Sequence, residues 1–125
     1  MAKICSEIEN GLLIATVTGN LTAKELIAVV IEYYRTGTVK NVIWDITNGS
    51  LQAIPLDDFK AIALAAKAAG ELGLRQGGKT VFVVSDDSEY KIAHIYTVIA
   101  EVTGVFSKYN VFKSIEEARD WINQH

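Results

Sequence analysis

Two short apolar runs most constrain the fold of this 125-residue chain. Residues 42–46 are apolar except for Asp45, and residues 81–84 are apolar throughout. Runs of this length without polar alternation are typical of central strands that are covered on both faces, as in sheets with helices packed on each side. The chain therefore needs helices before and after these strands to cover them.

A β-hairpin is predicted at the start of the chain. Two strand-like runs, residues 4–9 and 12–18, are separated by Asn10-Gly11, the dipeptide that best tolerates the positive φ angles of a type I′ turn. Thr22 and Glu25 then have the spacing of a capping box, in which each side chain accepts a hydrogen bond from the other residue's backbone. A helix is expected to begin there.

Strands and helices alternate over the rest of the chain. We expect strands at residues 39–46, 81–84 and 109–112, and helices at 56–72, at 89–102 and after Ser114. The order β-β-α-β-α-β-α-β-α predicts one α/β domain over residues 1–125, with a mixed, mostly parallel sheet that begins with the antiparallel hairpin.

The helix at 89–102 has one clear apolar stripe at helical spacing. The residues expected to be buried are Ile92, Ile95, Val98, Ile99 and Val102. The residues expected to face solvent are Tyr90, His94, Thr97 and Glu101.

Charge and composition exclude several classes of function. The net charge is −3 and the Lys and Arg residues are scattered, so the electrostatic footprint of a nucleic-acid-binding protein is missing. Cys5 is the only cysteine, which excludes an internal disulfide and favours a reducing, cytoplasmic setting. No run approaches the roughly 18 apolar residues of a membrane span.

The familiar catalytic motifs are absent or misplaced. Gly77-Gly78-Lys79-Thr80 resembles part of a phosphate loop, but it lies between a helix and a strand instead of between a strand and a helix. His94 is the only internal histidine, no G-x-S-x-G elbow occurs, and Cys5 lies in a strand where a small buried thiol is the simpler interpretation. We expect a protein that is not an enzyme and that has no metal or cofactor.

Polar side chains gather where strands are expected to run into helices, which is where open α/β sheets bind ligands. Two interpretations remain open: these groups cap helices and shape turns, or they form a binding rim. The residues concerned are Asn20, Thr22, Asp45, Thr47, Asn48, Ser50, Ser85, Asp86 and Ser88.

Four stretches together resemble a STAS domain of the SpoIIAA-like type, over nearly the whole chain. They are residues 17–22 (VTGNLT), 42–47 (VIWDIT), 81–84 (VFVV) and 112–122 (FKSIEEARDWI). The resemblance implies a STAS/SpoIIAA-like α/β fold and a regulatory module that binds a protein partner. Anti-sigma-factor antagonists of this type are phosphorylated on a serine at the start of the helix that follows the central aspartate.

That serine is missing here. Aligned on Asp45, the matching stretch is Ala53-Ile54-Pro55-Leu56, so the resemblance predicts a binding module without the phosphoserine switch. Asp57 and Asp58 are compatible with a permanent negative charge, but acids also suit the first turn of any helix. The residues assigned to ligand or partner binding are Asp45, Asn48, Ser50, Asp57, Asp58, Ser85 and Asp86.

Three further hypotheses compete with or extend this prediction. A small apolar ligand or lipid would occupy a cleft lined by Phe59, Ile62, Tyr96, Val105 and Phe106, unless those side chains simply fill the core. An enzyme would use Asp45 and Asp86 as paired carboxylates. A homodimer would form through apolar surface left exposed at Tyr33, Tyr34 and Trp121.

Overall fold

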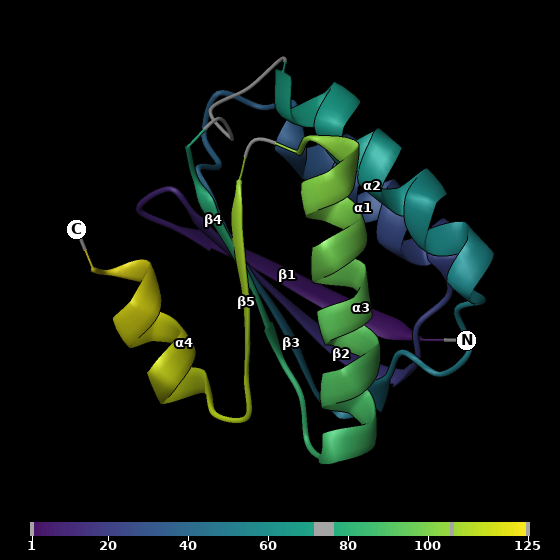
Figure 1. Ribbon diagram of the computed structural model, residues 1–125. Helices are drawn as coiled ribbons and strands as arrows, with labels where there is room; N and C mark the ends of the chain where they lie inside the picture. Colours follow the sequence, from purple (N-terminus) through teal and green to yellow (C-terminus); the bar gives the residue numbers. More distant parts are fainter. Residues whose placement is uncertain (1, 72–76, 106, 125) are drawn as a thin grey trace.

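The computed structural model describes residues 2–71, 77–105 and 107–124 (Figure 1). The strands are β1 (Lys3–Glu9), β2 (Leu12–Asn20), β3 (Asn41–Ser50), β4 (Lys79–Val83) and β5 (Lys108–Phe112). The helices are α1 (Ala23–Tyr34), α2 (Leu56–Glu71), α3 (Asp87–Thr103) and α4 (Ile115–Ile122). The predicted order of strands and helices is confirmed.

The five strands form one sheet in the order β1-β2-β3-β4-β5. β1 is antiparallel to β2, and all other neighbours are parallel. Helices α1, α2 and α3 pack on one face of the sheet, and α4 packs on the other (Figure 1). The expected mixed, mostly parallel sheet with a hairpin at its edge is therefore present.

Local sequence signals explain the first turn and the first helix. Asn10 and Gly11 have φ angles of 49° and 81°, as a type I′ turn requires. At the start of α1 the Glu25 backbone N–H donates to the Thr22 hydroxyl at 3.2 Å, and the Thr22 backbone N–H donates to the Glu25 carboxylate at 3.1 Å. The hydrogen bond from the Thr22 hydroxyl lowers the pKa of Glu25 below its usual value.

The central strand β3 is covered on both faces, as its apolar sequence predicts. On one face Trp44 and Ile46 lie in the main core beneath α1, α2 and α3, and the Trp44 indole N–H donates to the Tyr34 hydroxyl at 3.2 Å. On the other face Ile43 lies in a second core that Ala118 and Ile122 of α4 complete. Each helix layer therefore fixes one face of the same strand.

β3 is longer than the sequence suggests. The apolar run predicts a strand over residues 39–46, but the strand begins at Asn41 and continues to Ser50. Its last residues include Asn48-Gly49-Ser50, which would locally favour a turn. The extension pairs with the end of β2, where Asn20 lies opposite Ser50, after a register shift between Thr16 and Thr18. The connection to α2 is therefore short, at residues 51–55.

The expected burial of α3 is only partly confirmed. Ile92 and Ile99 are partly buried against the main core. Tyr90, His94 and Glu101 are exposed as expected. The buried side of α3 consists of Ala93, Tyr96, Thr97, Ala100 and Glu89. The apolar side chains with large exposed fractions are Ile95 (41%), Val98 (46%) and Val102 (84%). Small residues allow α3 to lie close to the sheet, so the helix turns these three branched apolar side chains outward.

The aromatic residues expected to leave apolar surface exposed are buried or half-buried. Tyr34 is buried in the main core, and Tyr33 is partly buried against it. Trp121 is partly buried, tilted against Phe112 and covered by the Lys79 ammonium group at 5.1 Å from its ring. A homodimer through these three residues is therefore not supported.

We predict that Gly49→Ala lowers the free energy of unfolding by about 1–3 kcal/mol, as overpacking usually does. A β-carbon at Gly49 would lie 3.0 Å from the Gly19 carbonyl oxygen and from two atoms of Val17, in the paired ends of β3 and β2. Denaturant unfolding monitored by circular dichroism measures the loss. Gly37→Ala is the control, because a β-carbon there meets no atom within 4 Å; equal stabilities of the two variants would contradict the prediction.

Candidate functional site

The candidate site lies where β2, β3 and β4 run into the helices that follow them. Two of the seven assigned residues, Asp57 and Asp58, lie in the first turn of α2. Three lie on β3 itself: Asp45, Asn48 and Ser50. Ser85 and Asp86 precede α3 and are exposed. The structure thus places all seven near one end of the sheet, although on more than one face.

Two of the three assigned residues of β3 accept hydrogen bonds from near neighbours in the chain. Asp45 follows Ile43 by two positions and so faces the side of the sheet that α4 covers. Its carboxylate accepts hydrogen bonds from the Thr47 hydroxyl at 2.8 Å and the Thr47 backbone N–H at 3.2 Å. The Ser50 hydroxyl accepts from the Gln52 N–H at 3.1 Å, and Asn48 is exposed.

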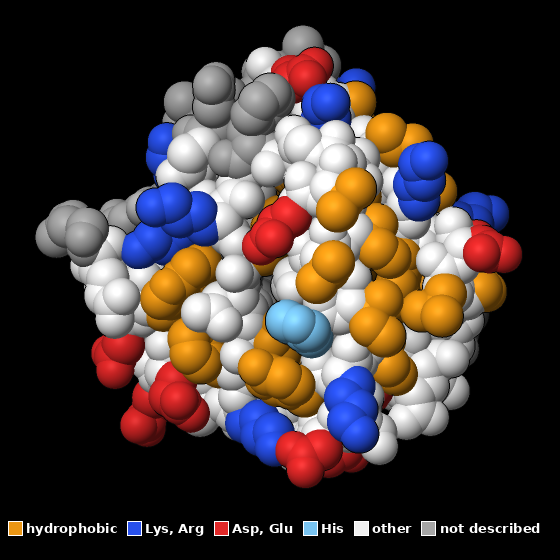
Figure 2. Space-filling model, in the orientation of Figure 1, with side chains coloured by type: hydrophobic (Ala, Val, Ile, Leu, Met, Phe, Trp, Pro, Cys, Tyr) orange, Lys and Arg blue, Asp and Glu red, His pale blue; other side chains and the backbone are white. Residues whose placement is uncertain are grey.

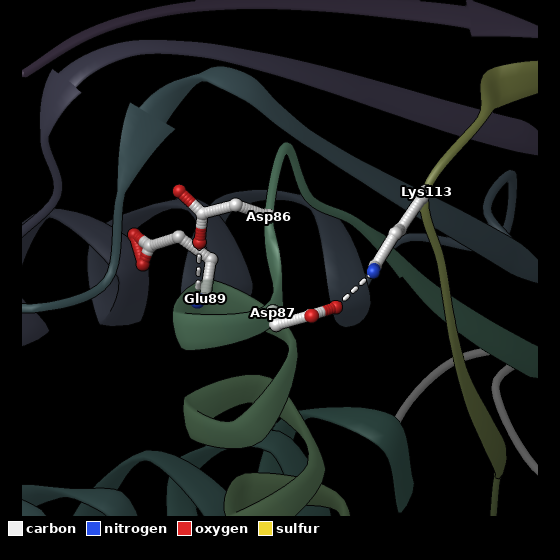
Figure 3. A network of polar contacts seen from close by, with 4 residues as sticks. All are labelled: Asp86, Asp87, Glu89 and Lys113. Carbon is white, nitrogen blue, oxygen red and sulfur yellow. Dashed lines mark hydrogen bonds and ion pairs between the residues drawn. The ribbon is translucent and has the colours of Figure 1, made fainter.

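The start of α3 carries the polar network drawn in Figure 3. Asp86 is the N-cap, and its carboxylate accepts from the Glu89 N–H at 2.9 Å. Lys113, in the turn between β5 and α4, forms an ion pair with Asp87 (Figure 3). That contact lowers the pKa of Asp87 and raises the pKa of Lys113. Both side chains are well exposed, so the pair contributes little to stability.

Glu89 is the residue that sequence reasoning missed. Its side chain is buried, with an exposed fraction of 3%, and its carboxylate points away from Lys113 in Figure 3. The carboxylate accepts the Leu51 backbone N–H at 2.7 Å, which ties the β3–α2 connection to the first turn of α3. The signal was the Asp86 and Glu89 spacing, which resembles a capping box, but the acid reaches a distant backbone instead of its own cap.

The first turn of α2 borders a groove on the surface. We call it the α2–α3 groove; it has a volume of about 400 Å³ and is lined by Leu56, Asp57, Lys60, Val98, Ile99, Val102 and Thr103. Figure 2 shows hydrophobic side chains gathered over α3 and the neighbouring part of α2. Of the assigned residues only Asp57 lines this groove, and Asp58 is half-buried beside it.

The apolar cleft expected from the sequence is part of the core. Phe59, Ile62 and Tyr96 have exposed fractions of 2%, 0% and 6%. The ring of Tyr96 packs edge-on against that of Phe59, with 5.7 Å between centroids. Val105 is partly buried against the same core, and Phe106 lies outside the described residues. The four described side chains fill the core instead of lining a ligand site.

The structure does not bring together the two carboxylates of the enzyme hypothesis. Asp45 faces the α4 side of the sheet, whereas Asp86 caps α3 on the opposite side, and each accepts hydrogen bonds from its own near neighbours. Within residues 2–71, 77–105 and 107–124, no three His, Cys, Asp or Glu side chains are grouped so as to hold a metal ion. Among the same residues, no helix has the length and apolar character needed to cross a membrane.

Comparison with solved structures identifies the fold. The chain matches the anti-sigma factor antagonist SpoIIAA in its unphosphorylated form, with a TM-score of 0.59, 15% identity, and coverage of 98% of this chain and 100% of that one. It matches an anti-sigma factor antagonist from Mycobacterium paratuberculosis with a TM-score of 0.61, 13% identity and coverage of 99% and 96%. The protein has a STAS/SpoIIAA-like fold.

A third match is an uncharacterised protein of the DUF3478 family with a SpoIIAA-like fold, from Shewanella loihica PV-4. Its TM-score is 0.55 at 14% identity, with coverage of 97% of this chain and 93% of that one. No protein-family model matches the chain, and no curated protein matches it by sequence. At these identities the matches establish the SpoIIAA-like fold and leave function to be argued from the surface.

We predict that Glu89→Ala lowers the free energy of unfolding by about 2–3 kcal/mol, because it leaves the buried Leu51 N–H without an acceptor. Glu101→Ala, which removes an exposed carboxylate from the same helix, should change stability by less than about 0.5 kcal/mol. Denaturant unfolding measures both, and amide hydrogen exchange at Leu51 should accelerate only in the Glu89 variant. An unchanged hydrogen-exchange rate at Leu51 would contradict the hydrogen bond between the Leu51 N–H and the Glu89 carboxylate.

Proposed function

We propose that this protein is a regulatory binding module without catalytic activity, and that it binds a protein partner at the α2–α3 groove. The observation that carries the proposal is the outward-facing apolar side of α3. Val98 and Val102 have exposed fractions of 46% and 84%, and Leu56 at the start of α2 has 60%. Apolar side chains gathered around a groove are typical of a surface that becomes covered in a complex.

The edges of the groove suit a protein partner. Asp57 and Lys60, both on α2, place one acidic and one basic side chain beside the apolar floor. Interfaces commonly combine an apolar centre with a polar rim, where charged groups contribute more to specificity than to affinity. Asn48, Ser50, Ser85 and Asp86 lie outside the lining of this groove, at or beyond the ends of β3 and β4.

The fold supports the same class of function. Two of the matched structures are anti-sigma factor antagonists, and the DUF3478 protein shares their SpoIIAA-like fold. In this chain the segment that corresponds to the phosphorylated serine contains the buried Ile54 and the exposed Leu56. We therefore propose a module, acting in the cytoplasm, whose binding is not switched by a phosphoserine at that position.

The contact between α2 and α3 gives the α2–α3 groove a fixed shape. α2 and α3 contact each other directly, and the Glu89 carboxylate holds the connection that leads into α2. The first turn of α2, which lines the groove, follows directly from the connection that Glu89 holds. A preorganised surface binds with less loss of conformational entropy than one that must order on binding.

We predict that Val98→Asp abolishes capture of the partner. A charged side chain at the centre of the groove would have to be buried without a counter-ion in the complex. Ile31→Asp on α1 is the matched control, since Ile31 has an exposed fraction of 44% and lies outside the groove. The measurement is affinity capture from the source organism followed by mass spectrometry, after circular dichroism has shown that both variants fold.

A protein retained by the wild type and by Ile31→Asp, but lost from Val98→Asp, is the expected result. A partner retained equally by Val98→Asp places binding elsewhere and contradicts the proposal. Equal loss from both aspartate variants would mean that added charge, and not the groove, determines capture.

A small apolar molecule is a second candidate occupant, because the groove has a volume of about 400 Å³ and an apolar floor. On this alternative, native mass spectrometry of the freshly purified protein should show a defined additional mass, and Val98→Asp should remove it. A spectrum with the mass of the chain alone, together with no thermal shift across a panel of fatty acids and phospholipids, would contradict a ligand role.

A further inference from the structure

The outer edge of β1 presents unpaired backbone groups, and it is independent of the α2–α3 groove. β1 is the first strand of the sheet order and pairs only with β2 within the part of the chain that the structure describes. Its side chains are largely exposed, including Ile8 with an exposed fraction of 45%. An exposed edge strand is a template for pairing with another strand.

The hairpin determines which backbone groups point outward. Glu9 and Leu12 flank the two-residue turn, so they form a hydrogen-bonded pair, and hydrogen-bonded pairs then alternate along the ladder. Every second residue of β1 bonds to β2 in this way. The residues between them direct their backbone N–H and C=O groups to the free edge, and these are Ile4, Ser6 and Ile8.

The sequence of this edge is complementary to itself. We propose that a second copy of the chain pairs with it, β1 against β1, antiparallel and centred on Ser6. In that register Lys3 lies opposite Glu9 of the second copy, and Ile4 lies opposite Ile8. Opposite charges and apolar side chains that face each other across strands stabilise a sheet.

The backbone supports this register as strongly as the side chains do. Ile4, Ser6 and Ile8, whose polar groups point outward, meet Ile8, Ser6 and Ile4 of the second copy. All three therefore form hydrogen-bonded pairs across a two-fold axis, as an isologous interface requires. Pairing of even-numbered residues with one another also keeps the helices of both copies on the same side of a continuous sheet.

Other registers of the β1–β1 pair would be less stable than the one centred on Ser6. Centring the pair on Cys5 places Ile8 opposite Ala2, whose N–H is already bound to the Glu25 carboxylate at 3.1 Å. Centring it on Glu7 places two Glu7 carboxylates directly opposite each other, which is unfavourable. Charged residues often protect edge strands from pairing, but here Lys3 and Glu9 are spaced so that two copies neutralise each other.

The charge on Glu9 is compatible with this pairing. Its carboxylate accepts from Arg119 of α4 at 2.8 Å, and more than half of its side chain remains exposed. A second oxygen is therefore available to Lys3 of the other copy. Because the interface is one strand wide, we expect a dimer that dissociates on dilution instead of an obligate one.

The first test changes the centre of the interface. Ser6→Pro removes the outward N–H, and proline is tolerated on an edge strand when that N–H faces solvent, so the monomer should fold. Ser6→Ala keeps the backbone donor and is the control. Sedimentation equilibrium should show a wild-type dimer, an unchanged dimer for Ser6→Ala, and a Kd raised at least tenfold for Ser6→Pro, with folding checked by circular dichroism.

A wild type that remains monomeric up to about 1 mM overturns the proposal. An equally stable dimer of Ser6→Pro moves the interface away from β1 and also overturns it. If Ser6→Pro does not fold, the Glu7→Cys cross-linking experiment tests the pairing through β1 without a proline.

The second test reads the register directly. Cys5 is exposed, and in the proposed register it lies opposite Glu7 of the second copy in a non-hydrogen-bonded pair, where side chains are closest. Glu7→Cys should therefore form a covalent dimer under mild oxidation, seen by mass spectrometry without reductant. The wild type, whose two Cys5 residues are diagonal across the strands, should not. Efficient oxidation of the wild type, or none in Glu7→Cys, overturns the register.

Discussion

Burial of β3 on both faces is the constraint on which the rest of this structure depends. Trp44 and Ile46 require a helical layer on one side, and Ile43 requires a second layer on the other. A single strand thereby determines that α1, α2 and α3 share one face and that α4 covers the opposite one. The ends of β2, β3 and β4 then lie together, and the connection from β3 into α2 reaches the first turn of α3, where Glu89 accepts the Leu51 N–H.

The parts of the fold that depend on local chemistry could be predicted from the sequence. Asn10-Gly11 specified the hairpin turn, and the Thr22 and Glu25 pair specified the start of α1. The end of β3 could not be predicted in this way, because Asn48-Gly49-Ser50 favours a turn locally. Its strand conformation comes from pairing with β2, and a β-carbon at Gly49 would lie only 3.0 Å from atoms of Val17 and Gly19 in that strand.

The candidate site was harder to predict because α3 packs through its smallest residues. Helical periodicity correctly placed Tyr90, His94 and Glu101 on the exposed side. It was wrong for Ile95, Val98 and Val102, which are exposed, and for Thr97, which is buried. Ala93 and Ala100 let the helix lie close to the sheet, while Thr97 is buried with its hydroxyl donating to the His94 carbonyl at 2.7 Å. The buried Glu89 depends on Leu51, 38 residues away in sequence, and no local pattern reveals such a partner.

The two surfaces proposed for this protein belong to opposite parts of the sheet. α3 contacts β5, at the far edge from β1, so pairing of two copies through β1 leaves the α2–α3 groove of each copy open. Two copies of the groove on one rigid sheet would face the same side, because the self-complementary register keeps both helical layers together. A partner that is itself dimeric, or that repeats its binding motif, would then gain avidity without any additional contact in either groove. Regulation would follow from protein concentration, since dilution would convert a bivalent platform into a monovalent one.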